Sequence, residues 1–321
     1  MVKRYSKWIL CICLMLLATY GLGRLYYRVT GGFTLGNIAY ELPQDLRREI
    51  EPLKQSEKEN LNRILSQPFH YLGKGCQSYV FKSDDGRYVL KFFKYQRLRP
   101  QAWLDWFAVI PWVDTYRLGK IEKKKQKLQG VFTSWKIAYE ELQPETGVVY
   151  IHLNKEPVLG KPFLLHDKMG FKHTLNLDQY EFLLQRKADM LCPILQKMVA
   201  SGDMQGSKEL LDRLLTMIQS EYTRGFADND HALMQNTGVL DGQPVHIDVG
   251  QFVKNSKVNN PLVYNQEIFN KTWKFRKWLE KESPELADHL VMRLKEIMGK
   301  EPFAQLKPRL NKATMGIIPN E

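Results

Sequence analysis

The chain has 321 residues, of which 44% are hydrophobic and 26% are charged, and this composition excludes a disordered protein. Its formal net charge of +12 favours anionic partners: phosphorylated ligands, an anionic membrane face or nucleic acid. The densest basic run, Lys120 to Lys127, predicts a solvated helix face, and because no nucleic-acid-binding signature accompanies it we expect no nucleic-acid partner. Four scattered cysteines are too few for a disulfide framework, and no Cys-x-x-Cys pair indicates zinc.

The N-terminus carries a basic tip followed by an apolar run. Three basic residues within the first seven positions precede the run, which extends from Trp8 to about Leu22. This pattern is typical of a signal sequence or of a membrane anchor, and the sequence after it has no clean small-x-small cleavage site. We therefore expect residues 1–30 to hold a cytosolic tip and a retained transmembrane helix, in a bacterial inner membrane. The side of the membrane stays open, because Arg24 and Arg28 nearly balance the leading charges.

Strand patterns begin after a polar linker, which we place at residues 31–65. Three strands are predicted in succession, with a Ser-Asp-Asp-Gly turn before the last: Phe69–Gly73, Ser78–Lys82 and Arg87–Phe93. A helix from about Thr115 to Leu142 follows, and two more β-rich runs come after it, Gly147–Asn154 and Pro162–Met169. This order predicts a mostly antiparallel five-stranded unit with one helix, over residues 66–170.

A tryptophan-rich apolar patch, Ala102 to Trp112, interrupts this unit within an insertion that we place at residues 97–114. The patch is too short to span a bilayer, and it contains Asp105 and Pro111. Two interpretations are open. The patch packs into the core, or it dips into a membrane interface, where aromatic side chains are favoured.

Helical patterns follow, and we assign residues 171–321 to a mainly helical region. Asn176 is suited to cap a long helix with a kink at Pro193. Ser207 is suited to cap the next helix, and Gly225 is suited to end it. The apolar stripe of that second helix predicts a buried face made of Leu210, Leu211, Leu214, Leu215 and Ile218.

The connection between the first two predicted strands contains glycine at two positions. Gly73 and Gly75 allow the backbone to approach phosphate oxygens, and their amides can donate to those oxygens. Lys91 lies on the third strand between hydrophobic neighbours, where it could reach the phosphates of a nucleotide. Lys94 is the lysine that we expect to face water instead. Taken alone, two glycines in this position are more typical of a surface hairpin.

A loop-rich stretch from Phe226 to Phe252 gathers acidic and amide side chains. Asp248 follows an apolar strand, and an acid that closes a buried strand is costly unless it meets a cation or hydrogen-bond donors. Carboxylate and amide oxygens suit magnesium, so Asp230, Asn236 and Asp248 are candidates for phosphate chemistry. The alternative interpretation is an acidic surface loop.

These motifs, in this order, resemble the protein-kinase-like superfamily over roughly residues 66–300. The resemblance implies an α+β, two-lobed protein-kinase-like fold. Its N-terminal lobe would be a five-stranded antiparallel sheet with one helix, its other lobe mainly helical, and a transmembrane helix would precede both. It also implies ATP and Mg²⁺ as cofactors and a hydroxyl group as acceptor.

The segment from Gly73 to Ser78 resembles the glycine-rich loop of that superfamily, with Ser78 where a third glycine is usual. The resemblance implies that Lys91 binds the nucleotide phosphates. It implies the same nucleotide-binding role for four residues of the hairpin: Gly73, Gly75, Ser78 and Val80.

An Asp-Asn-Asp sequence takes the place of the His-Arg-Asp motif, so the resemblance implies that Asp230 is the catalytic aspartate. Asp228 is a reserve candidate for the base. Ile-Asp-Val-Gly resembles the Asp-Phe-Gly motif, which makes Asp248 a magnesium ligand. Asn236 matches the second metal ligand, but it follows Asp230 by one residue more than is usual, so the loop must bulge or the match slips.

The glutamate that should pair with the nucleotide lysine is not fixed by the sequence. Glu122 is the first choice, since it lies in the first half of the predicted helix, and Glu140 is the second. No Ala-Pro-Glu motif follows Asp248, and the remaining chain is short for a protein-kinase helical lobe. The sequence therefore looks more like the small-molecule branch, which includes aminoglycoside phosphotransferases and lipopolysaccharide core sugar kinases.

Three hypotheses follow. The first is an active, membrane-associated phosphotransferase whose acceptor is a lipid, a sugar or a protein. The second is a catalytically inactive kinase fold, a pseudokinase, that serves as a binding module at a membrane. The third is a membrane-associated interaction protein with no nucleotide site, which leaves the ordered motifs unexplained. Membrane orientation bears on the first, because basic residues at the N-terminus tend to stay in the cytosol and send the rest of the chain outside, away from ATP.

Overall fold

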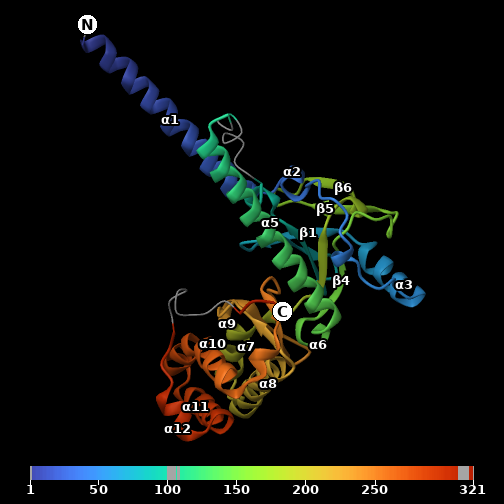
Figure 1. The fold of residues 1–321 in the computed structure, drawn as a ribbon, viewed down its shortest axis with the longest axis vertical. Helices are drawn as coiled ribbons and strands as arrows, with labels where there is room; N and C mark the ends of the chain where they lie inside the picture. The colour runs from blue at the N-terminus through green and yellow to red at the C-terminus, as the bar shows by residue number, and fades with distance from the viewer. Residues whose placement is uncertain (1, 100–105, 107–108, 310–317, 321) are drawn as a thin grey trace. The chain divides into compact units, whose positions relative to one another are not determined.

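The computed structural model of the chain describes residues 2–99, 106, 109–309 and 318–320. Helices and strands are mixed along the chain, which confirms the predicted α+β class (Figure 1). The chain divides into two compact units, and each is described by itself below. The first unit consists of residues 1–99 and 152–182, and the second of residues 100–151 and 183–321.

Most of the helices lie in the second unit, and most of the longer strands lie in the first. The described helices are α1 (Val2–Thr30), α2 (Leu35–Ile38), α3 (Gln55–Leu65), α5 (Pro111–Glu140), α6 (Gln143–Thr146), α7 (Leu191–Ala200), α8 (Met204–Thr223), α9 (Leu233–Asn236), α10 (Pro261–Glu282), α11 (Pro284–Met298) and α12 (Lys300–Gln305). The described strands are β1 (Phe69–Lys74), β2 (Ser78–Ser83), β3 (Tyr88–Phe93), β4 (Val148–His152), β5 (Pro162–His166), β6 (Lys172–Asn176), β7 (Phe182–Arg186), β8 (Asp189–Met190), β9 (Phe226–Asp228), β10 (Thr237–Leu240), β11 (Gln243–His246) and β12 (Phe252–Lys254).

The main sheet has seven strands, in the order β4-β7-β3-β2-β1-β5-β6, so the prediction of a five-stranded sheet is wrong. Its β1–β2, β2–β3 and β5–β6 pairs are antiparallel, whereas β1 and β5 run parallel. The two strands that the sequence analysis missed, β6 and β7, lie in the stretch assigned to helices. β7 is buried on both faces, and a strand without polar alternation cannot be distinguished from a buried helix by its periodicity.

Helix starts in this part of the chain also differ from the prediction. Asn176 caps only a short 3₁₀ turn, in which its Oδ1 accepts the Asp178 amide at 3.1 Å. The helix after it, α7, begins at Leu191, so Pro193 lies in the first turn, where proline is tolerated, and marks no kink. Asp203, not Ser207, caps α8, and it accepts the Gly206 amide at 2.9 Å. The predicted α8 stripe is buried and Gly225 follows the helix at φ +84°, as expected.

Aromatic side chains form the core of the first unit. Phe33, which follows α1, lies edge-on to Tyr79 and Phe81 of β2, with ring centroids 5.3 and 5.1 Å apart. Phe69 of β1 packs on Phe163 of β5 at 5.2 Å. The hairpin β1–β2 is therefore supported by large buried rings beneath it.

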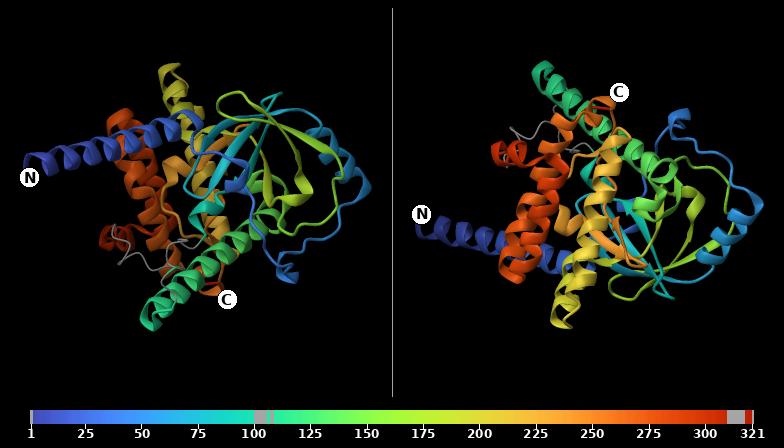
Figure 2. Two further views of the ribbon diagram at one scale, coloured as in Figure 1. Left: turned by 90° about the horizontal axis from the view of Figure 1, so that it is seen from above. Right: turned by 90° about the horizontal axis from the view of Figure 1, so that it is seen from below.

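Aliphatic side chains of packed helices form the core of the second unit. Its α8, α10 and α11 lie side by side (Figure 2). The buried cluster includes Leu211 and Leu214 of α8, Phe275 of α10 and Leu290 of α11, all of them fully enclosed. This helical layer supports the loops that carry the acidic residues.

The N-terminal helix α1 has the length and apolar character needed to cross a membrane, over Trp8–Thr30, and its side chains there are unburied (Figure 1). This agrees with the predicted transmembrane helix, although a signal sequence near the N-terminus has the same properties. The tryptophan-rich patch lies largely outside the described residues. Its described residues Trp106, Val109 and Trp112 are exposed, so these three side chains are not part of the core.

Candidate functional site

The second unit holds the three predicted aspartates in the same local geometry. Each aspartate Oδ1 accepts the amide of the residue two positions later: Asp228 from Asp230 at 2.9 Å, Asp230 from Ala232 at 3.0 Å and Asp248 from Gly250 at 3.2 Å. This is the Asx-turn, in which a short carboxylate orders its own loop. The loops that carry Asp230 and Asp248 are therefore folded by the residues that the sequence analysis singled out.

Two strand pairings bring these loops together. β9 pairs with β12, and the Asn229 amide donates to the Gln251 carbonyl at 3.1 Å. The Gln251 side chain in turn donates from Nε2 to the other Asp230 carboxylate oxygen, at 3.2 Å. Asp230 is thus joined to the segment that directly follows Asp248.

The hairpin β10–β11 brings Asn236 and Asp248 to the same end of one ladder. Thr237 lies opposite His246, and the Ile247 amide donates to the Asn236 carbonyl at 2.7 Å. The extra residue between Asp230 and Asn236 is accommodated by the short helix α9, which ends at Asn236. The loop therefore folds so that the longer spacing does not separate the two candidate metal ligands.

Asn236 and Asp248 fit a magnesium ion better than a metal bound by protein alone. The Asn236 side chain is buried, and among the described residues its Nδ2 has no hydrogen-bond partner. No cluster of three or more His, Cys, Asp or Glu side chains suited to a metal occurs in the described ranges. Mg²⁺ typically uses one or two protein oxygens together with water and phosphate, so this donor set suits it. Asp248 itself is exposed, so the expectation that it pays a burial cost is wrong.

Asp228 is held in a buried ion pair. Its Oδ2 lies 3.1 Å from Lys271 Nζ of α10, and both side chains are only 3% exposed. Both of its carboxylate oxygens are occupied, by the Lys271 ammonium and by the Asp230 amide. A carboxylate that is buried and paired in this way is suited to hold the loop that carries Asp230.

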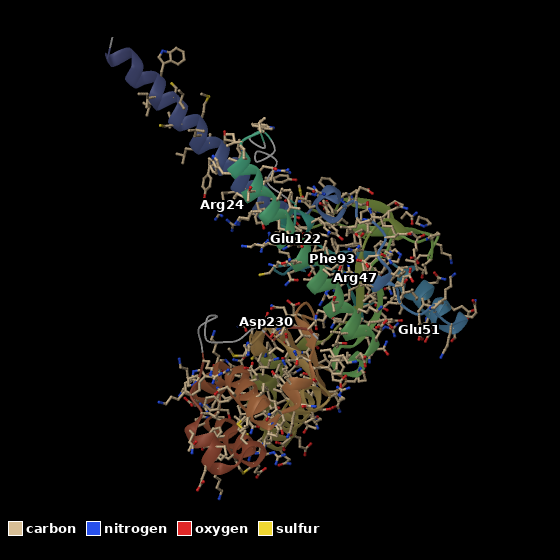
Figure 3. All side chains as sticks on the ribbon, in the orientation of Figure 1. Arg24, Arg47, Glu51, Phe93, Glu122 and Asp230 are labelled. Atoms are coloured by element: carbon tan, nitrogen blue, oxygen red, sulfur yellow. The ribbon has the colours of Figure 1, made fainter. Side chains whose placement is uncertain are left out.

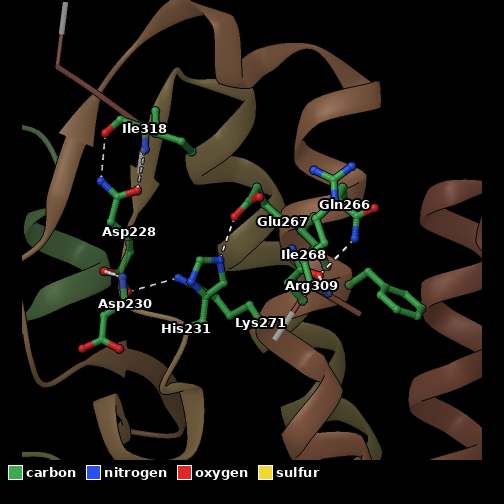
Figure 4. Close-up of polar contacts among 12 residues, drawn as sticks. Asp228, Asp230, His231, Gln266, Glu267, Ile268, Lys271, Arg309 and Ile318 are labelled. Carbon is green, nitrogen blue, oxygen red and sulfur yellow. Dashed lines mark hydrogen bonds and ion pairs between the residues drawn. The ribbon is translucent and has the colours of Figure 1, made fainter. Parts of the chain in front are cut away.

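A second α10 side chain holds the residue after Asp230. His231 Nε2 lies 2.7 Å from Glu267 Oε2, and both side chains are largely buried. Glu267 and Lys271 are one helical turn apart, so one face of α10 contacts both sides of Asp230 (Figure 4). Neither residue was among the predicted site residues; the signal in the sequence was two opposite charges at i, i+4 in a helical pattern.

Ser134 of α5 fixes the loop after Asp248. Its Oγ donates to the Val249 carbonyl and accepts the Phe252 amide, both at 2.6 Å. Ser134 is fully buried, so its hydroxyl serves the loop and not solvent. Nothing in the sequence pointed to it, because a serine within a helix has no distinctive pattern.

In the first unit, the predicted glycine-rich loop is a tight turn between β1 and β2. The Gly75 amide donates to the Ser78 carbonyl at 2.9 Å, and the ladder shifts register next to Gly73. A Cβ added at Gly73 would meet no described atom within 4 Å, and at Gly75 only Ser78 Oγ at 4.0 Å. The described fold therefore does not by itself require glycine at either position. The space next to both residues also leaves their backbone open to a ligand.

The lysines of β3 and its end are both buried. Lys91 lies opposite Val80 in the β2–β3 ladder. Lys94 is 3% exposed, and its Nζ donates to the Gly75 carbonyl, so the expectation that it faces water is wrong. Burial lowers the pKa of Lys94 to about 8, with a smaller contribution from Lys74 and Arg97 nearby.

The two candidate glutamates lie in different parts of α5. Glu122 lies in its exposed amino-terminal half, where its carboxylate accepts a hydrogen bond from Gln126 Nε2 at 3.1 Å (Figure 3). Glu140 ends the half of the helix that carries most of its buried residues, and its Oε1 lies 3.7 Å from Lys136 Nζ. Which of the two pairs with Lys91 stays a prediction.

No protein-family model matches the sequence, and no curated protein matches it either. Among solved structures, the bifunctional kinase-methyltransferase WbdD is similar over 74% of this chain, with 17% identity and a TM-score of 0.34. The complex of Rv3197 with erythromycin from Mycobacterium tuberculosis is similar over 93% of this chain and 98% of its own, with 14% identity and a TM-score of 0.29. The chain spans 45% of the WbdD chain. At these TM-scores neither likeness decides fold or function.

Proposed function

We propose that the chain is an ATP- and Mg²⁺-dependent phosphotransferase that transfers the γ-phosphate to a hydroxyl acceptor and is anchored at a membrane by α1. The observation that carries this proposal lies in the second unit. The β9–β12 and β10–β11 pairings gather Asp230, Asn236 and Asp248, which are the residue types that phosphoryl transfer requires.

Each of these residues has a distinct role in the proposal. Asp230 accepts the proton of the acceptor hydroxyl as the oxygen forms its bond to phosphorus and the bond to the leaving ADP breaks. Its partly exposed carboxylate is oriented by Ala232 and Gln251. Asn236 and Asp248 would hold Mg²⁺, which neutralises phosphate charge when bound.

The remaining predicted residues serve the nucleotide. The backbone from Gly73 to Ser78 covers the phosphates, with Val80 beneath, and Lys91 binds them. Asp228 is assigned to hold the loop and not to act as base, because its carboxylate is already paired with Lys271.

The first experiment compares the full chain with its Asp248→Asn variant. We expect Mg²⁺ and ATP together to raise the thermal unfolding temperature of the parent, and we expect the variant to lose both this shift and phosphate transfer. Asparagine can form the same Asx-turn, so the fold should survive the change. Asp241→Asn is the matched control, since Asp241 is an exposed aspartate in the turn of the β10–β11 hairpin.

The outcomes separate the hypotheses. Retained transfer in Asp248→Asn would contradict the metal-ligand assignment. Magnesium-dependent ATP binding without transfer to any hydroxyl, water included, would favour the pseudokinase. No stabilisation of the parent at millimolar ATP would favour an interaction protein that lacks a nucleotide site.

A further inference from the structure

The carboxyl end of α1 is fixed to the first unit by side chains from two different hairpins. Lys168, in the turn between β5 and β6, donates from Nζ to the Arg28 carbonyl at 2.7 Å. Lys74, at the end of β1, donates to the Gly31 carbonyl at 2.5 Å, and its ammonium lies 3.5 Å from the centre of the Tyr27 ring. The helix is therefore built into the unit and is not a loose tether.

The chain leaves α1 through a turn that admits only glycine. Gly31 and Gly32 have φ values of +68° and +74°. A Cβ at Gly31 would lie 2.4 Å from the Tyr71 hydroxyl oxygen, and one at Gly32 would lie 2.3 Å from the Tyr27 ring. Phe33 is buried directly after them. This exit fixes the direction of α1 relative to the hairpins that contact it.

The sheet register places the two hairpin turns that contact α1 at the same end of the strands. β1 and β5 run parallel, with Phe69 opposite Leu165, so the turns after these strands leave the sheet on the same side. The turn between β2 and β3 lies at the opposite end of the strands, because Ser83 pairs with Phe69 at the start of β1. The two ends of β1 are roughly 17 Å apart, at a rise of about 3.3 Å for each residue.

Residues 167–172, which are the turn between β5 and β6 and the first residue of β6, form a rigid support for exposed apolar side chains. Asp167 Oδ1 accepts the amides of Met169 and Phe171 at 2.9 and 3.0 Å, which orders the turn. Met169 and Phe171 nevertheless point into solvent, with 50% and 59% of their surface exposed, and Lys168 and Lys172 flank them. Exposed apolar side chains flanked by lysines are typical of surfaces that bind an anionic membrane interface.

The length of α1 places this turn at the depth of the lipid headgroups. A helix needs about 20 residues to cross a hydrocarbon core of about 30 Å. Counted from Trp8, that length ends at Tyr27, one residue before the carbonyl that Lys168 binds. Tyr26, Tyr27 and Arg24 in the last turns of α1 are the residue types found at a membrane interface (Figure 3).

We propose that residues 167–172 form a membrane-contacting turn, which inserts Met169 and Phe171 among the headgroups and acyl ends of an anionic bilayer beside α1. This inference rests on the membrane anchoring in the proposed function and not on phosphate transfer. Leu72 of β1, on the neighbouring hairpin, is also exposed, at 51%. The turn and the helix together hold the first unit in one orientation at the membrane.

The test uses the full chain in lipid nanodiscs that contain a photoactivatable phosphatidylglycerol with its diazirine near the headgroup. After irradiation, peptides bonded to lipid are mapped by mass spectrometry. We expect adducts on α1 and on residues 167–172, and none on the turn between β2 and β3, which is the internal control. Replacing the probe with photoactivatable phosphatidylcholine should lower the adducts on the turn by about fivefold for each lysine engaged.

Two variants check the assignment. Met169→Ser combined with Phe171→Ser should remove the adducts on the turn and leave those on α1. Adducts on α1 without adducts on the turn would overturn the proposal and leave membrane anchoring intact. Adducts on neither would overturn both, and because no outcome depends on ATP turnover, the test is separate from that of phosphate transfer.

Discussion

The two units hold the loops that carry their proposed functional residues by different side chains. In the second unit the side chains are carboxylates, and Asp228, Asp230 and Asp248 each close a turn with the amide two residues later. In the first unit they are lysines, and Lys74 and Lys94 reach carbonyls 43 and 19 residues away in the sequence. The acidic loops combine these local turns with contacts from α10 and α5, whereas the lysines around the glycine turn are held by contacts distant in the sequence.

This difference indicates which substitutions should change activity without changing the stability of the fold. Asparagine forms the same Asx-turn as aspartate, so an aspartate-to-asparagine change in the second unit removes charge and leaves the turn. A buried lysine combines charge, a long apolar stem and a distant hydrogen bond, so its replacement changes packing as well.

Asp230→Asn should have the largest effect on turnover. If Asp230 is the proposed base, the variant loses the group that accepts the hydroxyl proton, so we expect transfer to fall about 10²- to 10⁴-fold. The unfolding temperature should stay close to that of the parent, because the Ala232 amide keeps its acceptor. Radiolabelled γ-phosphate transfer and thermal unfolding measure the two effects. Transfer at the parental rate would contradict the base assignment.

Lys271→Met should have the largest effect on stability. It leaves the Asp228 carboxylate buried without its cation, and removing one partner of a buried pair costs about 3–5 kcal/mol. Urea unfolding measures the free energy. Lys274→Met is the control, because Lys274 is exposed on the same helix and its loss should change stability by less than about 0.5 kcal/mol. Adding Asp228→Asn to Lys271→Met should restore part of the loss, since no buried charge then remains.

Local patterns predicted the elements that local interactions form. The strands around Gly73 and Lys91 and the buried stripe of α8 follow from alternation and helical period, and the structure has them. The α10 residues that hold the loop of Asp230 could not be found in this way. Glu267 and Lys271 act on residues some forty positions earlier, and only the folded chain shows that proximity.

The wrong predictions also concern residues whose surroundings depend on the tertiary fold. Lys94 has the sequence environment of a solvent-facing lysine, and only the return of the glycine turn onto it encloses its ammonium. β7 was assigned to a helix because burial on both faces removes the alternation by which strands are recognised.

Glu140→Gln should separate the two candidate partners of the nucleotide lysine. If Glu140 positions that lysine, its loss should lower kcat/KM for ATP by up to about 100-fold, the cost of a misplaced catalytic group. Glu122→Gln should change it by less than about twofold, because that side chain lies in the exposed half of α5 and bonds Gln126. Steady-state kinetics with varied ATP measures both. A larger loss in Glu122→Gln than in Glu140→Gln would favour Glu122 as the partner of Lys91.

Lys94 predicts a smaller effect, on the pH dependence of stability. Its folded-state pKa of about 8 lies below the ordinary lysine value, so between about pH 8 and 10.5 the unfolded chain binds more protons than the folded one. Stability should therefore rise with pH across this window, by on the order of 1 kcal/mol from this group. Lys94→Met should remove that rise, which urea unfolding at several pH values measures as a difference from the parent.

Lys82→Met is the matched control for this prediction, because Lys82 lies on the neighbouring strand and is partly exposed. It removes one lysine from the same sheet and leaves the bond between Lys94 and the Gly75 carbonyl in place. If the parent and Lys94→Met show the same pH dependence, the Lys94 ammonium keeps its proton in the folded protein. The glycine turn would then be held by a charged donor. The two units would then differ in how far along the sequence these contacts extend, and not in whether burial changes the charge of the side chain.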